Sequence, residues 1–261
     1  MNFSKMTGLG NDFIIIDEKE ISKEVDRSHL AKKLCDRRFG IGADGLMVLS
    51  YKQSPIFLEM YNSDGSQAST CGNALRCIGK YLYETNWTST ENIEIDTTSG
   101  IKNLQLETRD NKVYSVTVNM GVPIIHSRNL ELENFNCVVI DIGNLHSVIF
   151  TPYLTDELVL EWGPEIEKHS SFENGVNVNF VHIQTRKSIR VKTWERGAGK
   201  TLACGSGASA SMVAAFLKGE VENKVMVNLD GGTLEINLEE QEKVVKMKGG
   251  CDWVFHGKVI N

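Results

Sequence analysis

Short apolar stretches, each bounded by glycine, asparagine or aspartate, recur along most of the chain. They are rich in valine and isoleucine, and this composition favours β-strands over helices. The predicted strands lie at residues 12–17, 56–62, 93–100, 114–120, 137–143, 176–183, 188–194, 225–229, 233–238 and 244–249. The pattern therefore predicts a chain built mainly from short strands.

Apolar residues follow helical spacing in fewer places. Residues 26–38 are amphipathic, and Asp26 is suited to cap a helix that starts there. A second helix is predicted after Cys71, where apolar side chains recur on one face at Ala74, Leu75, Ile78, Tyr81 and Leu82. Residues 207–217, shortly after Cys204, are small or apolar nearly all round, which predicts a helix buried on every side.

The second half of the chain resembles the first when the sequence is shifted by one fixed distance, for example from Asn11 to Asn144 (11 + 133 = 144). The matched pairs are Gly10-Asn11 with Gly143-Asn144, Phe39 with Phe172, Gly42 with Gly175, Val48 with Val181, Tyr61 with Trp194, and Cys71-Gly72 with Cys204-Gly205. One offset without gaps serves all of them. We therefore predict two similar halves that face each other, each with strands around one central helix and a cysteine at the start of that helix.

Composition and charge exclude several classes of protein. The chain has 261 residues, 41% of them hydrophobic and 24% charged, which is typical of globular domains. Its net charge of -6 does not favour nucleic acid or anionic membranes as partners. The N-terminal sequence does not resemble a signal peptide, and the apolar runs are too short to cross a bilayer, so we expect a cytoplasmic protein. The six cysteines form no CxxC pair and meet no histidine cluster, which predicts neither a disulfide framework nor a metal site.

A cysteine followed by glycine at the start of a helix has a specific chemical use. The first turn of a helix presents unpaired N–H groups and the positive end of the helix dipole, so it stabilises a thiolate or a bound carboxylate. Glycine leaves the backbone open to a ligand, which accounts for Gly72, Gly205 and Gly207. Two such helix starts, facing each other, would hold one carboxylate between them, with a sulfur on either side of the adjacent carbon. One sulfur would take the α-proton of an amino acid and the other would return a proton to the opposite face.

A free cysteine is most often a small buried hydrophobic residue. That interpretation serves for Cys35, Cys77, Cys137 and Cys251, which have no equivalent in the other half. For Cys71 and Cys204 the shared position favours catalysis. A thiol redox switch that uses the same two cysteines is the alternative from a different class of protein.

Four stretches of the sequence resemble the diaminopimelate epimerase family. They are FSKMTGLGNDF near the start, FGIGADG with YNSDGSQASTCGN, GNLHSV, and ERGAGKTLACGSG. The resemblance implies an α/β (α+β) fold of two pseudo-symmetric domains, each a mostly antiparallel β-structure around a central helix. We place the first domain at 1–116, joined by a C-terminal strand at about 251–261, and the second at 117–250, with the active site in the cleft between them.

The resemblance also implies a function and a set of site residues. The reaction would interconvert LL- and meso-diaminopimelate without a cofactor, as a step toward lysine and peptidoglycan in bacteria. Cys71 and Cys204 would be the catalytic acid and base, and the protein would form a homodimer. The expected substrate-binding residues are Asn11, Asn62, Gly72, Asn73, Asn144, His146, Asn177, Glu195, Arg196, Gly205 and Ser206. Within this set, backbone N–H groups would bind the reacting carboxylate, His146 and Glu195 would orient the amino group, and Arg196 with the asparagines would bind the far end.

Some positions depart from the family pattern, namely Thr7, Ala74-Leu75, Leu145, Lys200 and Ser209. Lys200 replaces an acidic residue just before the second catalytic motif, and we expect it to be exposed and without influence on the site. These departures leave open a cofactor-independent racemase of another amino acid, such as histidine, proline, hydroxyproline or a broader set. Arg196 favours a substrate whose far end is charged.

Overall fold

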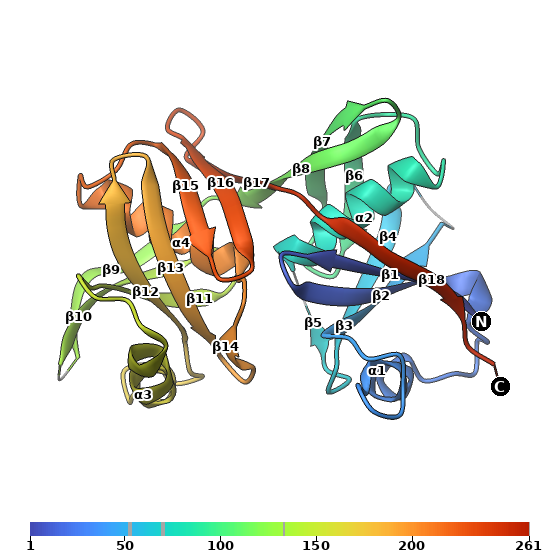
Figure 1. Cartoon of the computed structure of the whole chain (residues 1–261), viewed down its shortest axis with the longest axis horizontal. Coiled ribbons are helices and arrows are strands. Elements are labelled where there is room, and N and C mark those ends of the chain that lie inside the picture. Colours follow the sequence, from blue (N-terminus) through green and yellow to red (C-terminus); the bar gives the residue numbers. More distant parts are fainter. Residues whose placement is uncertain (52–53, 69–70, 133, 261) are drawn as a thin grey trace. The chain divides into compact units, whose positions relative to one another are not determined.

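The computed structural model describes residues 1–51, 54–68, 71–132 and 134–260. The chain falls into two compact units: unit 1 is Met1–Val118 with Gly250–Asn261, and unit 2 is Asn119–Gly249. Each unit consists of strands and two α-helices (Figure 1). Ser69 and Thr70, which belong to one of the motifs above, lie outside the described residues.

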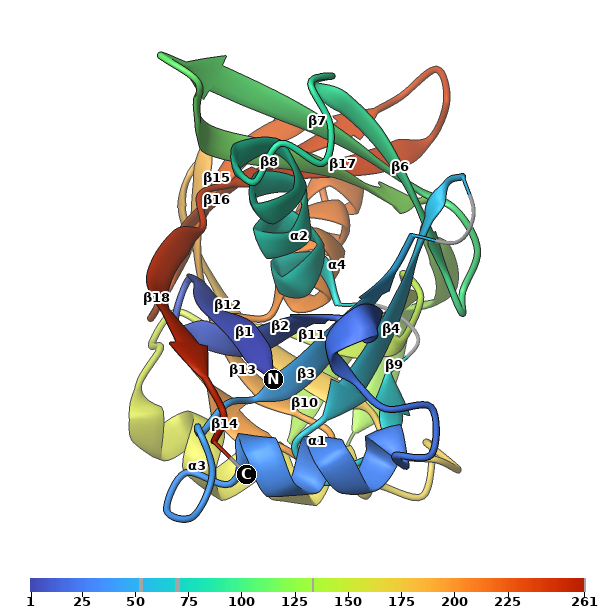
Figure 2. The same ribbon diagram turned by 90° about the vertical axis from the view of Figure 1, so that its right-hand side faces the viewer.

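Unit 1 is a series of paired strands in the order β18, β1, β2, β3, β4, β6, β7, β8, with β5 added to β4. The pairs β2–β3 and β4–β6 are parallel and the others are antiparallel. The elements are β1 (Asn2–Gly8), β2 (Asn11–Asp17), η1 (Glu18–Glu20), α1 (Arg27–Cys35), β3 (Gly45–Ser50), β4 (Ile56–Asn62), β5 (Gln67–Ala68), α2 (Gly72–Glu84), β6 (Asn92–Thr97), β7 (Lys102–Arg109), β8 (Lys112–Gly121) and β18 (Asp252–Lys258). The strands surround α2, while α1 packs outside them on β3 and β4 (Figure 2).

Unit 2 repeats this arrangement in the order β9, β10, β11, β12, β13, β15, β16, β17, with β14 added to β13. Here too the third and fifth pairs, β11–β12 and β13–β15, are the parallel ones. The elements are β9 (Ile124–Leu132), β10 (Phe135–Asp141), β11 (Leu145–Phe150), α3 (Asp156–Glu167), β12 (Asn177–Thr185), β13 (Ser188–Glu195), β14 (Gly199–Thr201), α4 (Gly205–Leu217), β15 (Lys224–Leu229), β16 (Gly232–Glu239) and β17 (Val244–Gly249). Helix α4 contacts strands β10 to β13 and β15 to β17 of its unit, so it occupies the central position that α2 has in unit 1.

The single offset expected from the sequence is wrong in one strand. Tyr61 and Trp194 are equivalent, yet Tyr61 pairs with Leu46 while Trp194 pairs with Val178. Strand β12 is therefore displaced by one residue relative to β3, so Leu46 corresponds to Val178, and Met47 to Asn179. Since a one-residue displacement reverses the faces of a strand, the match of Val48 with Val181 was a coincidence.

Local sequence explains the helices. Asp26 accepts a hydrogen bond from the Ser28 N–H at 2.9 Å and caps α1, while Thr155 accepts one from the Leu158 N–H at 3.2 Å and caps α3. Helix α3 was not predicted from the sequence, because Pro164 interrupts its pattern. In α2, a Cβ on Gly79 would lie 3.0 Å from the Leu106 side chain, so glycine allows strand β7 to approach the helix closely.

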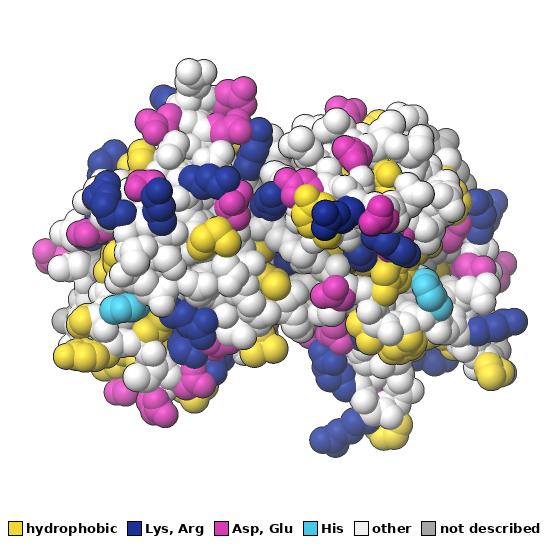
Figure 3. Space-filling model, turned by 45° about the horizontal axis from the view of Figure 1, so that its top comes forward, with side chains coloured by type: hydrophobic (Ala, Val, Ile, Leu, Met, Phe, Trp, Pro, Cys, Tyr) yellow, Lys and Arg dark blue, Asp and Glu magenta, His cyan; other side chains and the backbone are white. Residues whose placement is uncertain are grey.

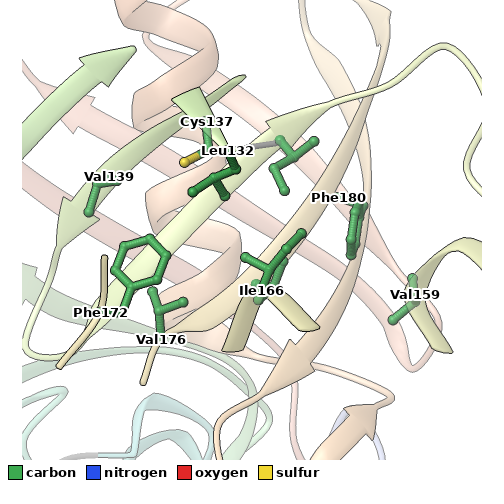
Figure 4. Close-up of a cluster of buried hydrophobic side chains, with 10 residues drawn as sticks. Leu132, Cys137, Val139, Val159, Ile166, Phe172, Val176 and Phe180 are labelled. Carbon is green, nitrogen blue, oxygen red and sulfur yellow. The ribbon is translucent and has the colours of Figure 1, made fainter. Parts of the chain in front are cut away.

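Each unit has its own hydrophobic core. Figure 4 shows that of unit 2, a single buried cluster that includes Val159 and Ile166 of α3, Cys137 of β10 and Phe180 of β12. In unit 1, Ile14, Leu46 and Val48 pack against Leu34 of α1. Burial raises the pKa of the Cys35 thiol to about 12 and also raises that of Cys137, which fits structural roles for both. In the described ranges, no helix is long and apolar enough to cross a membrane.

Candidate active site

Cys71 and Cys204 occupy the same position in their units. Each is the N-cap residue of a central helix, with extended backbone angles, and each is followed by a buried glycine that opens the helix. The first N–H groups of a helix have no partner within it, so the backbone of Gly72 and Gly205 is suited to bind an anion. Each cysteine therefore lies at a helix start whose backbone N–H groups are suited to an anion.

In unit 1, Cys71 is half-buried beside two of the predicted asparagines. Its Sγ lies 3.8 Å from Asn11 Oδ1, and Asn73 Nδ2 donates to the same oxygen at 3.2 Å. Asn11 Nδ2 in turn donates to Asp44 Oδ2 at 2.6 Å. The structure thus brings Asn11, Cys71 and Asn73 together and adds Asp44, which the sequence analysis missed. The Asn62 side chain donates from Nδ2 to Ser66 Oγ at 2.9 Å, in the turn after β4.

A buried arginine lies one turn further along α2. The Arg76 side chain is fully buried, and its Nη1 donates to Asn73 Oδ1 at 3.0 Å while its Nε donates to the Gly250 carbonyl at 3.2 Å. Burial lowers the pKa of this guanidinium, and Cys71 is among the groups that interact with its charge. Arg76 was also missed, because an arginine on a helix is expected to reach solvent.

In unit 2, Cys204 has different surroundings and is only 4% exposed. Its Sγ accepts a hydrogen bond from the Gly207 N–H at 3.4 Å and lies 3.5 Å from Ser206 Oγ. Burial, together with the negative charge of Glu195, raises the pKa of the Cys204 thiol well above its ordinary value. Glu195 is itself held by the Thr201 hydroxyl, which donates to its Oε1 at 2.6 Å. The structure therefore joins Cys204, Ser206 and Glu195, and it favours the neutral thiol at Cys204.

His146 is fully buried, and both of its ring nitrogens have protein partners. Its Nε2 lies 2.8 Å from Asn144 Oδ1, and its Nδ1 lies 3.0 Å from Asn179 Nδ2. Burial lowers the pKa of His146 to about 3, so the imidazole is neutral near neutral pH. Asn179 is another residue that the sequence analysis missed, although Asn177 and Asn179 alternate along a strand as residues of one face do.

Asn177 and Arg196 form a second small group. Arg196 N donates to Asn177 Oδ1 at 3.0 Å, and Asn177 Nδ2 donates to the Leu145 carbonyl at 2.9 Å. The exposed guanidinium of Arg196 donates from Nη1 to the Asn174 carbonyl at 2.9 Å. The Asn177 amide therefore fixes the backbone at the end of β13, from which Arg196 extends.

The charge of Lys200 is neutralised within unit 2. Its Nζ lies 2.5 Å from Asp156 Oδ2 and 3.8 Å from Asp230 Oδ2, and the side chain is 24% exposed. The expectation that Lys200 is exposed to solvent is wrong, because α3 supplies Asp156 as its partner. With both carboxylates so close, the ammonium is paired and is not an isolated charge.

A sequence profile of the family described as Diaminopimelate epimerase matches residues 3–126 and 138–254. The chain belongs to the diaminopimelate epimerase family. A diaminopimelate epimerase of Caldanaerobacter subterraneus subsp. tengcongensis is 40% identical over an alignment of 276 positions, which covers 99% of this chain and 99% of that protein. That of Acetivibrio thermocellus is 39% identical over 276 residues, covering 99% and 98% of the two proteins.

A solved structure shows the same fold in a distant protein. It is described as a probable proline racemase from Agrobacterium radiobacter with bound carbonate, and it matches with a TM-score of 0.77 at 14% identity, covering 99% of this chain and 92% of that one. At this identity the likeness shows the fold alone. Together the comparisons confirm the predicted family, the α/β fold class, and an isomerase with the epimerase function of the relatives.

Proposed function

We propose that this chain interconverts LL- and meso-diaminopimelate by moving one proton at an α-carbon, with Cys71 and Cys204 as the acid and base. The observation that carries the proposal is the equivalence of the two cysteines, each at the start of a central helix, in a chain 40% identical to a named diaminopimelate epimerase. A reaction that inverts one carbon needs an acid and a base on opposite faces. A duplicated fold supplies one sulfur from each copy.

The reacting carboxylate binds the N–H groups of Gly72, Asn73, Gly205 and Ser206. Loss of the α-proton leaves negative charge that spreads into this carboxylate. Fixed N–H dipoles at two helix starts stabilise that charge as it develops, which lowers the barrier to proton removal. Glu195 pairs with the ammonium on the same carbon, and its hydrogen bond from Thr201 keeps the carboxylate in position.

The two sulfurs begin the reaction in different protonation states. Cys204 is a thiol, because burial and Glu195 both oppose its ionisation. When Cys71 has lost its proton, the buried positive charge of Arg76 favours the thiolate. Cys71 then takes the α-proton from one face, Cys204 gives its proton to the other face, and the pair exchange roles for the reverse reaction.

The far end of diaminopimelate carries a second ammonium and a second carboxylate. We assign its recognition to Asn11, Asn62, Asn144, Asn177 and Arg196, since a guanidinium suits a carboxylate and an amide suits either group. The catalytic thiols must stay reduced, so the proposal includes a cytoplasmic location. The homodimer stays a prediction, which the molar mass in solution would test.

Exchange of the α-proton with deuterated water tests the proposal. Solvent deuterium is expected at the α-position of LL-diaminopimelate together with formation of the meso isomer. A panel of L-proline, 4-hydroxy-L-proline and L-histidine should remain unlabelled. Labelling of a panel amino acid in preference to diaminopimelate would replace the proposed substrate. Absence of any labelling by the reduced enzyme would refute the proton transfer itself and leave the redox alternative.

A further inference from the structure

A chain of buried hydrogen bonds runs through unit 2 behind Asn144. The Thr193 hydroxyl donates to Asn179 Oδ1 at 3.1 Å, and Asn179 Nδ2 lies 3.0 Å from His146 Nδ1. His146 Nε2 then lies 2.8 Å from Asn144 Oδ1. Thr193, Asn179 and His146 are at most 2% exposed. Asn144, the last residue in this series of hydrogen bonds, is half-buried.

The direction of these hydrogen bonds follows from one backbone group. The Ser147 carbonyl, which can only accept, receives a hydrogen bond from Asn179 Nδ2 at 3.3 Å. The Asn179 amide is therefore oriented with its N–H groups toward Ser147 and His146, so His146 Nδ1 is an acceptor. The proton of the neutral imidazole must be on Nε2, which donates to Asn144 Oδ1. Asn144 is left with its amide N–H groups to present to a ligand.

The fold does not require these polar side chains. The equivalent positions in unit 1 are Phe13 for His146, Met47 for Asn179 and Met60 for Thr193, and Met47 pairs with Met60 as Asn179 pairs with Thr193. All three are buried. Since buried polar groups are costly unless every one is satisfied, their presence in unit 2 alone indicates a function other than stability.

Asn11, the equivalent of Asn144, is oriented the opposite way. Its Nδ2 donates to the Asp44 carboxylate at 2.6 Å, and its Oδ1 accepts from Asn73. The two equivalent asparagines are thus oriented differently. Asn11 directs its oxygen toward Asn73 and Cys71, whereas Asn144 directs its oxygen toward His146 and keeps its N–H groups for a ligand. Asn144 is the one suited to a carboxylate.

We propose that Thr193, Asn179 and His146 act as positioning residues that fix Asn144 as a hydrogen-bond donor, and thereby make the site selective for a substrate with a carboxylate at its far end. The inference rests on the proposed function. A second observation links these residues to α4, the helix that Cys204 caps: a Cβ on Gly207 would lie 2.3 Å from Asn179 Oδ1. Glycine is needed there because Asn179 occupies that space. The equivalent residues of unit 1 are Ala74 and Met47.

Replacing Asn179 by leucine tests the proposal, with L-lysine as the matched substrate because it is diaminopimelate without the far carboxylate. In Asn179→Leu, no amide N–H holds His146 Nδ1 as an acceptor, so the tautomer with its proton on Nδ1 becomes accessible. Nε2 can then accept from Asn144 Nδ2, which turns the Asn144 oxygen toward the ligand. KM for diaminopimelate is expected to rise on the order of ten- to hundredfold, the effect of losing a charge-assisted hydrogen bond, with little change in kcat. Slow α-proton exchange of L-lysine should not change, and Thr193→Ser, which keeps the hydroxyl, should retain the wild-type KM.

The inference would be overturned if Asn179→Leu left KM for diaminopimelate unchanged. It would also be overturned if the variant lost the same factor of activity with diaminopimelate and with L-lysine. If the wild-type enzyme exchanged no proton of diaminopimelate, the proposed function would fail instead. Nitrogen NMR of the wild-type enzyme with labelled histidine tests the positioning without any substrate, even if Asn179→Leu does not fold. A neutral His146 with its proton on Nε2 is expected at neutral pH, and a proton on Nδ1 would overturn the inference.

Discussion

The two units share one fold and surround their cysteines in opposite ways. Unit 1 places a buried cation, Arg76, one turn beyond Cys71, and the equivalent residue in unit 2 is Ser209, whose hydroxyl donates to the Gly205 carbonyl at 2.9 Å. Unit 2 places an anion, Glu195, beside Cys204, and the equivalent residue in unit 1 is the neutral Asn62. The backbone geometry is thus duplicated while the charges are not. The two thiols therefore lie in different electrostatic surroundings, as the proposed acid and base require.

The largest effect is expected from replacing either cysteine by serine. A serine hydroxyl holds its proton far more tightly than a thiol, so neither variant provides the missing acid or base. Cys71→Ser and Cys204→Ser should each lose roughly 10²–10⁴-fold in kcat, the usual contribution of a positioned acid or base. Steady-state assays in both reaction directions check this. Cys35→Ser, at a buried cysteine of unit 1 without an equivalent, is the control. Full activity in Cys71→Ser or Cys204→Ser would contradict a mechanism that uses both sulfurs.

Glu195→Gln would make the surroundings of Cys204 more like those of Cys71, where the equivalent residue is the neutral Asn62. Without the negative charge, the pKa of Cys204 should fall, and thiolate should form at lower pH than in the wild-type enzyme. The ammonium of the substrate also loses its partner, so kcat/KM should fall on the order of ten- to hundredfold. The ultraviolet absorbance of thiolate during titration checks the first effect, taken as the difference between the Cys71→Ser protein and the Cys71→Ser/Cys204→Ser protein, which cancels the other free cysteines. If the pKa of Cys204 did not change in this variant, Glu195 would have no influence on the ionisation of that thiol.

His146 should make unit 2 sensitive to acid. Its folded pKa of about 3 lies below the ordinary value of 6.5, so the unfolded chain binds a proton that the folded one excludes as pH falls. Stability is therefore lost between pH 6.5 and 3, and about 2 kcal/mol should already be gone on moving from about pH 7 to about pH 5.

Urea unfolding at the two pH values measures this loss. The variant His146→Phe, which copies Phe13 of unit 1, should lose correspondingly less stability over the same interval. The exposed His126 provides the control, since His126→Gln should keep the acid sensitivity of the wild-type protein. Equal losses in the wild-type protein and His146→Phe would contradict the prediction.

The smallest effect is expected from Lys200→Glu. The new carboxylate would lie among Asp156 and Asp230, where Lys200 now forms ion pairs that are partly open to solvent. We expect a loss of about 1 kcal/mol of unfolding free energy, reduced at high salt, and an almost unchanged pH–rate profile. Lys23→Glu, at an exposed position in unit 1, should have less effect. A large change in the pH–rate profile would mean that Lys200 acts on Cys204 directly.

The sequence predicted most of what depends on local pattern. Valine- and isoleucine-rich runs located ten of the described strands, and glycine after each cysteine located the starts of α2 and α4. They did not locate β1, β3, β5, β7, β9, β11 and β14. The sequence did not predict α3, where Pro164 interrupts the pattern, or the one-residue displacement of β12, which depends on pairing between strands. Arg76, Asp44 and Thr193 were missed for a similar reason, because their burial or hydrogen bonds depend on tertiary packing. For Asn179 the sequence did hold a signal, its alternation with Asn177.

Surface charge agrees with a small-molecule enzyme. On the face drawn in Figure 3, lysine and arginine side chains lie among aspartate and glutamate side chains, and neither sign forms a continuous surface. Such mixing does not favour a polyanion. The charges that matter for the proposed reaction are instead the few beside the helix starts, chiefly Arg76 and Glu195.

Because of strand β18, the two units are completed at different times during translation. In unit 2 the outer neighbour of β10 is β9, which directly precedes it in the chain. In unit 1 the corresponding neighbour of β1 is β18, which is translated after the whole of unit 2. A nascent chain can therefore complete the second unit while the first still exposes one edge of β1. Although it emerges first from the ribosome, unit 1 is the last to be finished.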